Sequence, residues 1–122
     1  MTHESLDLDT RLSQAEIIKL FRVSIAESSV NAKFGRIAID EDRAVKVDEV
    51  AAYATGKTVT SQWCVQIYVR DDEATRHVEL AILGSSILGK VWQGTTRSYS
   101  LSHGRLKAIK VINALKEAEA TR

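Results

Sequence analysis

The fold of this chain is most constrained by a long alternating run, from Lys57 to Arg70. One set of alternate positions reads Val59, Ser61, Trp63, Val65, Ile67 and Val69. Such a two-residue period is typical of a strand with one buried face. Three acidic residues, 71–73, follow as a turn, and His77 to Leu83 returns with apolar residues at alternate positions. The two segments predict a long antiparallel hairpin with Trp63 on its core face.

The opposite side of the predicted strand carries mostly polar side chains: Gln62, Cys64, Gln66, Tyr68 and Arg70. An antiparallel sheet commonly leaves one polar face to water. We therefore expect this face to be solvated, and a binding platform is the alternative.

Two amphipathic helices are predicted, one towards each end of the chain. Ser13 to Glu16 has the form of a capping box and starts a helix that ends near Ser28, with an apolar stripe formed by Ile17, Ile18, Phe21 and Ile25. The last helix should run from about Gly104 to Ala118, with Ser102 as its N-cap. An apolar stripe at this spacing indicates a core-facing helix, and docking to a partner is the alternative for the first one.

Three further segments carry weaker signals. Short alternating runs on either side of Asp40-Glu41-Asp42 predict a hairpin over residues 33–47. Residues 48–56 favour a short helix, although a continued strand is also compatible with them. A strand should lie somewhere in Lys90–Leu101, where Gly94-Thr95-Thr96 would form a bulge or loop.

These elements predict one α+β domain: an antiparallel sheet of four to five strands, with the N-terminal and C-terminal helices packed on one face. The domain should cover residues 13–122, because residues 1–12 are polar and are expected to form a flexible tail. The order of helix, strands and helix, with Leu88-Gly89, Gly94 and a helix starting Arg105-Leu106-Lys107-Ala108, loosely resembles double-stranded-RNA-binding domains over the last half of the chain.

Composition narrows the cellular setting. Cys64 is the only cysteine among 122 residues, so no internal disulfide can form. The acidic N-terminus lacks the basic and apolar regions of a signal peptide, and no apolar run reaches the roughly 18 residues of a membrane span. We expect a cytoplasmic protein without membrane contact.

Catalytic and metal-binding motifs are weak. Gly84 to Lys90 has the spacing G-x-x-x-x-G-K of a phosphate loop, but Val91 stands where a metal-binding hydroxyl is needed, so we interpret the glycines as a turn. The acidic triplets 40–42 and 71–73 suit turns, and the three histidines lack metal-ligand spacing. We expect no cofactor and no metal, and a non-enzymatic protein in preference to an enzyme.

Charge is unevenly distributed along the chain. Residues 90–122 carry seven basic and two acidic side chains, for a net charge of +5, whereas residues 1–89 have a net charge of −4. Basic residues interleaved with aromatic ones can bind a phosphate backbone and stack on bases. The candidate nucleic-acid-binding residues are Lys90, Trp92, Arg97, Tyr99, His103, Arg105, Lys107 and Lys110.

We hypothesise a small nucleic-acid-binding or regulatory protein that uses this C-terminal segment, with DNA and RNA both open. The first alternative is a protein-interaction module, possibly homodimeric, that acts through the sheet edge or its open face. The second is a small-molecule-binding or enzymatic domain. The cations could also be only the solvated face of the last helix, with Trp92 and Tyr99 in the core or on an edge strand.

Overall fold

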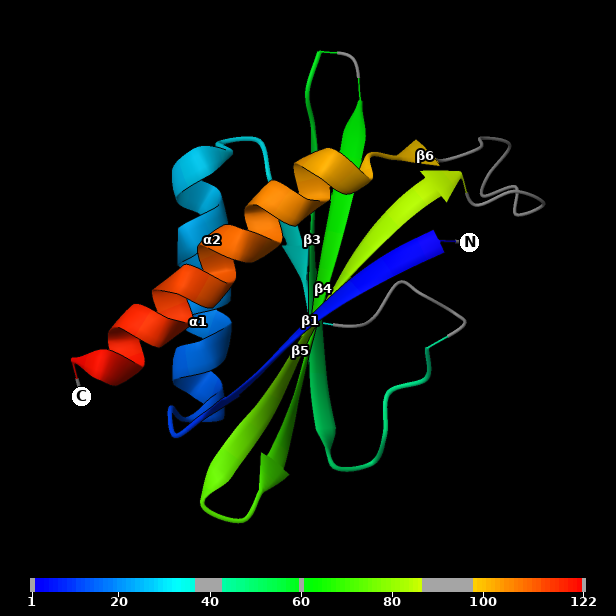
Figure 1. Cartoon of the computed structure of the whole chain (residues 1–122). Helices are drawn as coiled ribbons and strands as arrows, with labels where there is room; N and C mark the ends of the chain where they lie inside the picture. The colour runs from blue at the N-terminus through cyan, green and yellow to red at the C-terminus, as the bar shows by residue number, and fades with distance from the viewer. Residues whose placement is uncertain (1, 37–42, 60, 87–97, 122) are drawn as a thin grey trace.

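Two helices cover one face of an antiparallel sheet in this α+β protein (Figure 1), as predicted. The computed structural model describes residues 2–36, 43–59, 61–86 and 98–121. In chain order the elements are β1 (Thr2–Thr10), α1 (Gln14–Ser28), β2 (Lys33–Gly35), β3 (Glu49–Lys57), β4 (Gln62–Asp72), β5 (Thr75–Ser86), β6 (Ser98–Tyr99) and α2 (Leu101–Ala120).

The predicted hairpin is the centre of the sheet. Strands β4 and β5 pair from Cys64 opposite Leu83 to Asp72 opposite Thr75, and Glu73 adopts a φ of 57° in the tight turn between them. The strand order is β1-β5-β6-β4-β3-β2, in which β5 also pairs directly with β4. The two-residue β6 lies at one end of this hairpin and pairs parallel to β4 and antiparallel to β5.

Both helices begin at a serine cap. The Ser13 hydroxyl accepts from the Glu16 amide at 3.2 Å while the Glu16 carboxylate accepts from the Ser13 amide at 3.3 Å, which confirms the predicted capping box. Helix α2 starts earlier than predicted, because its cap is Ser100 and not Ser102. The Ser100 hydroxyl accepts from the His103 amide at 3.3 Å, so the cap satisfies a donor of the first turn.

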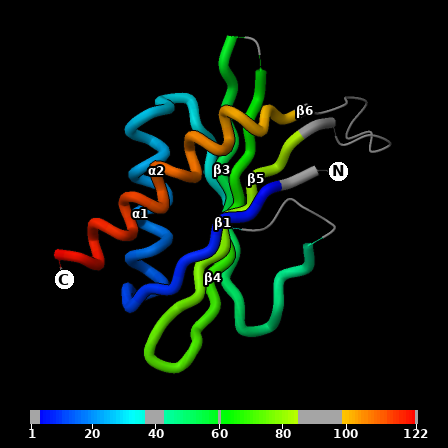
Figure 2. The backbone as a smooth tube through the Cα atoms, in the orientation of Figure 1, coloured from blue at the N-terminus to red at the C-terminus, as the bar shows by residue number. Residues whose placement is uncertain are grey.

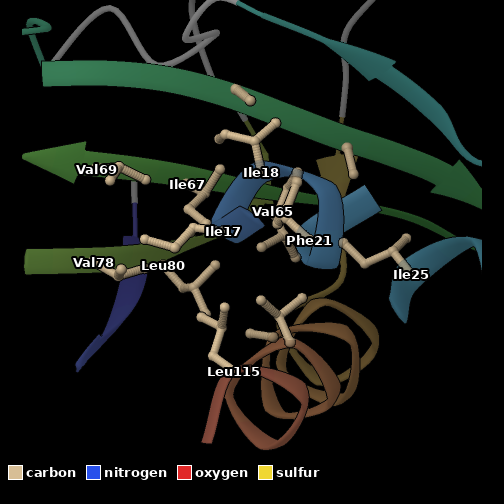
Figure 3. Close-up of a cluster of buried hydrophobic side chains, with 14 of the residues drawn as sticks. Ile17, Ile18, Phe21, Ile25, Val65, Ile67, Val69, Val78, Leu80 and Leu115 are labelled. Carbon is tan, nitrogen blue, oxygen red and sulfur yellow. The ribbon is translucent and has the colours of Figure 1, made fainter. Parts of the chain in front are cut away.

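The core lies between the helices and one face of the sheet (Figure 3). Ile17 and Phe21 of α1 and Leu115 of α2 point towards the central strands, where they meet fully buried side chains including Val65, Ile67, Val69, Val78 and Leu80. Each fully buried side chain of this size contributes about 1.5–3 kcal/mol through removal of apolar surface from water. The apolar period of β4 therefore selects the helix-covered face.

The middle of the second face of β4 is also buried, with Gln62 and Arg70 half-buried at its ends, so the prediction of a solvated face is wrong. Cys64, Gln66 and Tyr68 are each 1% exposed or less. The segment 43–48 lies on the side of the sheet away from both helices (Figure 2). From it the Arg43 guanidinium stacks over the Tyr68 ring, 3.9 Å from the ring centroid. Residue alternation cannot reveal such coverage, because a connection from elsewhere in the chain supplies it.

The expected N-terminal tail is instead the edge strand β1, which pairs with β5 from Thr2 to Thr10. Leu6 and Leu8 pack against the core, whereas Asp7 and Asp9 are exposed. Asp9 lies 2.8 Å from Nδ1 of His77, measured from its Oδ1 atom. Only two apolar residues mark this strand, which is why its composition suggested a mobile segment.

Residues 49–57 form β3, so the short helix expected there is wrong and the strand alternative holds. Of the hairpin predicted over 33–47, the described residues show one strand, the three-residue β2, which pairs with β3 through Phe34 opposite Ala54. Residues 43–47 form no strand, and the predicted turn at 40–42 lies outside the described residues. With β1 preceding α1, the element order also departs from that of double-stranded-RNA-binding domains.

Gly84 belongs to β5 rather than to a turn. A Cβ atom there would lie 2.1 Å from Cγ of Leu101, so the glycine lets the first turn of α2 approach the sheet. The remaining phosphate-loop positions, 87–90, lie outside the described residues, as do 90–97 of the strand expected before the last helix. Neither helix of the described chain is long and apolar enough to cross a membrane.

Candidate nucleic-acid interface

Five of the eight predicted nucleic-acid-binding residues lie on β6 and α2 and can be placed. The other three, Lys90, Trp92 and Arg97, fall outside the described residues. Helix α2 packs beside α1 on the same face of the sheet (Figure 1), with Gly104, Ala108, Val111 and Leu115 as its buried side. The orientation of each remaining candidate follows from its position relative to this side.

Tyr99 is 4% exposed and packs with Cys64 and Leu83 in a small cluster on the face away from the helices. A ring in this position is not available for stacking on a base. Tyr99 is therefore a buried residue, as the core alternative expected, because pairing of β6 with β4 and β5 places its side chain against Cys64 and Leu83.

His103 joins the start of α2 to the connection between β3 and β4. Its Nδ1 atom lies 2.9 Å from the Ser100 hydroxyl and 3.2 Å from the Ser61 hydroxyl. The ring is half-buried in this arrangement. His103 thus holds the helix start in position, a role that its sequence context does not predict.

Arg105 forms an ion pair with Glu4 of the edge strand β1. Its Nε donates to Oε2 of Glu4 at 2.9 Å, and its Nη2 contacts the second carboxylate oxygen. Hydrogen bonding within this pair raises the pKa of Arg105 and lowers the pKa of Glu4. The pair is solvent-exposed, so Arg105 remains on the surface while part of its charge is neutralised.

Lys107 connects the two helices. Its Nζ donates to the Ser28 carbonyl at 3.2 Å and to the Ser28 hydroxyl at 2.9 Å, and it lies 5.4 Å from the centroid of the Trp63 ring. Burial, followed by the nearby charge of Lys110, lowers the pKa of Lys107. A cation suits the C-terminal end of α1, where carbonyl groups lack helical partners. Lys107 therefore stabilises the packing of the helices.

Lys110 is the exposed cation of the predicted set that makes no ion pair with the described residues. Leu106, which is 61% exposed, and Asn113 lie one turn before and after Lys110 on the exposed half of α2. Arg105, Ile109, which is 42% exposed, and Lys116 lie along one flank of the same exposed half. Leu106, Ile109, Asn113 and Lys116 were not among the predicted binding residues. Positions three or four apart share a helix surface. The polar positions of this surface follow from the helical spacing of the sequence, and we call the exposed half of the helix the α2 outer face.

A groove of about 520 Å³ runs along the opposite flank of the helical layer, beside α1. Its described lining consists of Gln14, Ala15, Ile18, Lys19, Arg22, Val23, Arg36 and Val50. Sequence reasoning missed this site because residues 1–89 together are acidic. The usable signal was the spacing of Lys19 and Arg22, which are three residues apart on α1 and therefore neighbours on its surface.

Within the described part of the chain, no three His, Cys, Asp or Glu side chains are grouped so that they could hold a metal ion. The arrangement offers surfaces with positive charge and some apolar area, which suit binding of an extended anionic partner. No known protein family, curated protein or solved structure matches this chain.

Proposed function

We propose that this chain is a non-enzymatic nucleic-acid-binding protein that contacts phosphates through the α2 outer face. The observation that supports the proposal is the exposure of Arg105, Lys110 and Lys116 on this face, against Glu117 as the acidic residue exposed beside them. From Arg105 to Lys116 the helix rises about 16 Å, which matches several phosphates along one strand.

The lysines at 110 and 116 are the direct phosphate contacts in this proposal, because both are exposed and neither forms an ion pair with the described residues. Arg105 contributes less while Glu4 is bound to it. Lys107 contributes to the surface only indirectly, since its ammonium group is held by Ser28. The proposed phosphate contacts are therefore fewer than the basic residues of the C-terminal segment.

The test is a fluorescence-anisotropy titration with short single-stranded and double-stranded DNA and RNA over a series of salt concentrations. The variant Lys110→Glu/Lys116→Glu should weaken binding and reduce the slope of log affinity against log salt by about 2 for a duplex, since two phosphate contacts are lost. The matched control is Lys33→Glu/Lys57→Glu, which makes the same charge change at exposed strand residues. Equal losses in both variants, or no saturable binding at low salt, would contradict the proposal.

A second candidate function is self-association through the edge strand β1. This strand ends the sheet order and pairs with β5 on one side. Antiparallel pairing of two copies centred on Leu6 would place Ser5 of one copy opposite Asp7 of the other, with both side chains exposed in the monomer. This register therefore avoids Asp7 facing a second carboxylate.

Substitution of one exposed residue tests that register. Ser5→Asp would place two carboxylates opposite each other across the dimer, whereas Ser5→Lys would place an amine opposite Asp7. Light scattering should find that the dimer is weakened by Ser5→Asp and retained by Ser5→Lys. A monomer at every concentration, or the same response to both changes, would remove this candidate.

A further inference from the structure

We infer that the groove beside α1 binds a short acidic segment of a partner protein, independently of the α2 outer face. The groove is lined by α1, by Arg36 and by Val50 near the start of β3, and Val50 and Ile18 supply apolar surface. Lys19, Arg22 and Arg36 border this surface, and all three are exposed. The described lining therefore combines a floor of aliphatic side chains with three positive charges.

The three cations are available for a ligand. Within the described residues Lys19, Arg22 and Arg36 form no ion pair, whereas Arg43, Arg76 and Arg105 each do. The described lining contains no acidic side chain. A carboxylate entering the groove would thus meet cations that form no ion pair with the described part of the chain.

The basic residues of α1 lie on the side of the helix that faces the groove. Lys19 and Arg22 are three residues apart and therefore neighbours on the groove side of the helix. Glu16 is engaged by Ser13 in the capping box, and Glu27 lies away from the groove lining. The result is a positive potential along one flank of a helix that has two acidic residues of its own.

Arg22 is also oriented by its surroundings. Its guanidinium lies 5.6 Å from the centroid of the Phe34 ring of β2, and Arg36 follows β2 directly in the chain. Stacking on an aromatic ring limits the positions of the planar guanidinium group. Such a group binds a carboxylate through two parallel hydrogen bonds, which suits recognition of Asp or Glu.

The lining favours an acidic peptide over nucleic acid. Among the described residues the lining of this groove contains no aromatic ring on which a base could stack, and its apolar residues are the aliphatic Ala15, Ile18, Val23 and Val50. Phe34 and Tyr53 line a smaller neighbouring pocket that shares Arg22 and Arg36 with the groove. In an extended peptide, alternate side chains point the same way and lie about 6.6 Å apart. A segment in which acidic and aliphatic residues alternate would place carboxylates towards the cations and aliphatic groups towards the floor.

The groove volume of about 520 Å³ lies within the range of ligand-binding sites. Binding of a segment with several carboxylates would be sensitive to salt, because the cations are exposed to solvent. Binding of the acidic segment is therefore reversible and of moderate affinity. The cations increase its rate of association, and the aliphatic floor determines how the segment is oriented in the groove.

The experiment titrates the intact chain into a fluorescein-labelled peptide of alternating Glu and Val residues, with a Gln-Val peptide of equal length as the ligand control. The variant Arg22→Gln/Arg36→Gln should weaken binding of the Glu-Val peptide about tenfold or more, as expected for loss of two charge-assisted contacts. Lys110→Gln/Lys116→Gln, the same change on the α2 outer face, should leave the peptide affinity within about twofold. Circular dichroism of both variants establishes that they are folded.

Three results would overturn the inference: no saturable binding of the Glu-Val peptide at low salt, equal binding of the Gln-Val peptide, or equal losses in the two variants. Loss of oligonucleotide binding in Arg22→Gln/Arg36→Gln, with the peptide affinity unchanged, would assign the groove to nucleic acid instead. The two sites are tested by different variants, so failure of either proposal leaves the result for the other intact.

Discussion

Replacement of Glu49 by glutamine should destabilise the fold, because this carboxylate holds the segment 43–48 on the sheet. Arg43 donates from Nη1 to Oε1 of Glu49 at 2.9 Å and from Nη2 to Oε2 at 2.8 Å. The Lys46 amide donates to the same carboxylate at 3.0 Å, and Arg43 also bonds to Glu79 at 3.2 Å. The Glu49 side chain is only 4% exposed.

The magnitude follows from these contacts. Hydrogen bonding by Arg43 lowers the pKa of Glu49 from 4.5 to about 2, so the folded state favours the charged form. Hydrogen bonds to charged groups contribute about 1.5–3 kcal/mol each. Since the Arg43 side chain is 22% exposed, solvent screens part of the interaction, and we expect a loss of about 2 kcal/mol.

The pH dependence has a defined sign. A lowered pKa stabilises the folded state fully above the unfolded value of 4.5, and the stabilisation is lost as the pH falls towards about 2. Glutamine cannot titrate. The difference in unfolding free energy between the natural protein and Glu49→Gln should therefore be largest near neutral pH and shrink steadily in acid.

Urea unfolding followed by circular dichroism measures this difference at a series of pH values. The matched control is Asp48→Asn, the same chemical change at the exposed neighbouring residue, which should alter stability by less than about 0.5 kcal/mol. If Glu49→Gln were as stable as the natural protein at neutral pH, or if the difference in stability did not change with pH, the hydrogen bonds of Glu49 would not be what holds the segment 43–48 on the sheet.

Two further substitutions and one labelling experiment test other parts of the structure. Glu4→Gln should release Arg105 from its ion pair and raise the affinity for an oligonucleotide, measured by anisotropy; unchanged affinity would remove Arg105 from the interface. Gly56→Val should cost about 1–3 kcal/mol in urea unfolding, because a Cβ atom at Gly56 would lie 2.4 Å from Cζ2 of Trp63, and a stability equal to the natural protein would refute this packing. The buried Cys64 thiol should react with a thiol reagent only after unfolding, and rapid labelling of the native protein would show that its face is open.

The two proposed surfaces differ in how far sequence could indicate them. The α2 outer face was predicted through Lys110, because the charge of the last helix is visible in the chain. Its limits were not, since the ion pair between Arg105 and Glu4 joins residues 101 positions apart. The groove was hidden because its cations come from α1 and from Arg36, both within the acidic part of the chain.

Local interactions made several elements predictable from sequence alone. The capping box of α1 involves residues three positions apart, and the alternation in β4 and β5 specifies two strands joined by a short turn. These signals depend on neighbouring residues, so they are present before the chain folds. The α+β class and the packing of both helices on one face follow from the same patterns.

Only the tertiary structure decided the edges of the sheet and the cover of its second face. Strand β1 packs two partly buried leucines against the core and gains its hydrogen bonds from β5, about 70 residues later in the chain. Tyr68 is buried on a face that alternation marks as polar, because Arg43 and its segment are brought there by the fold. Periodicity records which side of an element is apolar, but burial and pairing depend on which distant residues arrive beside it.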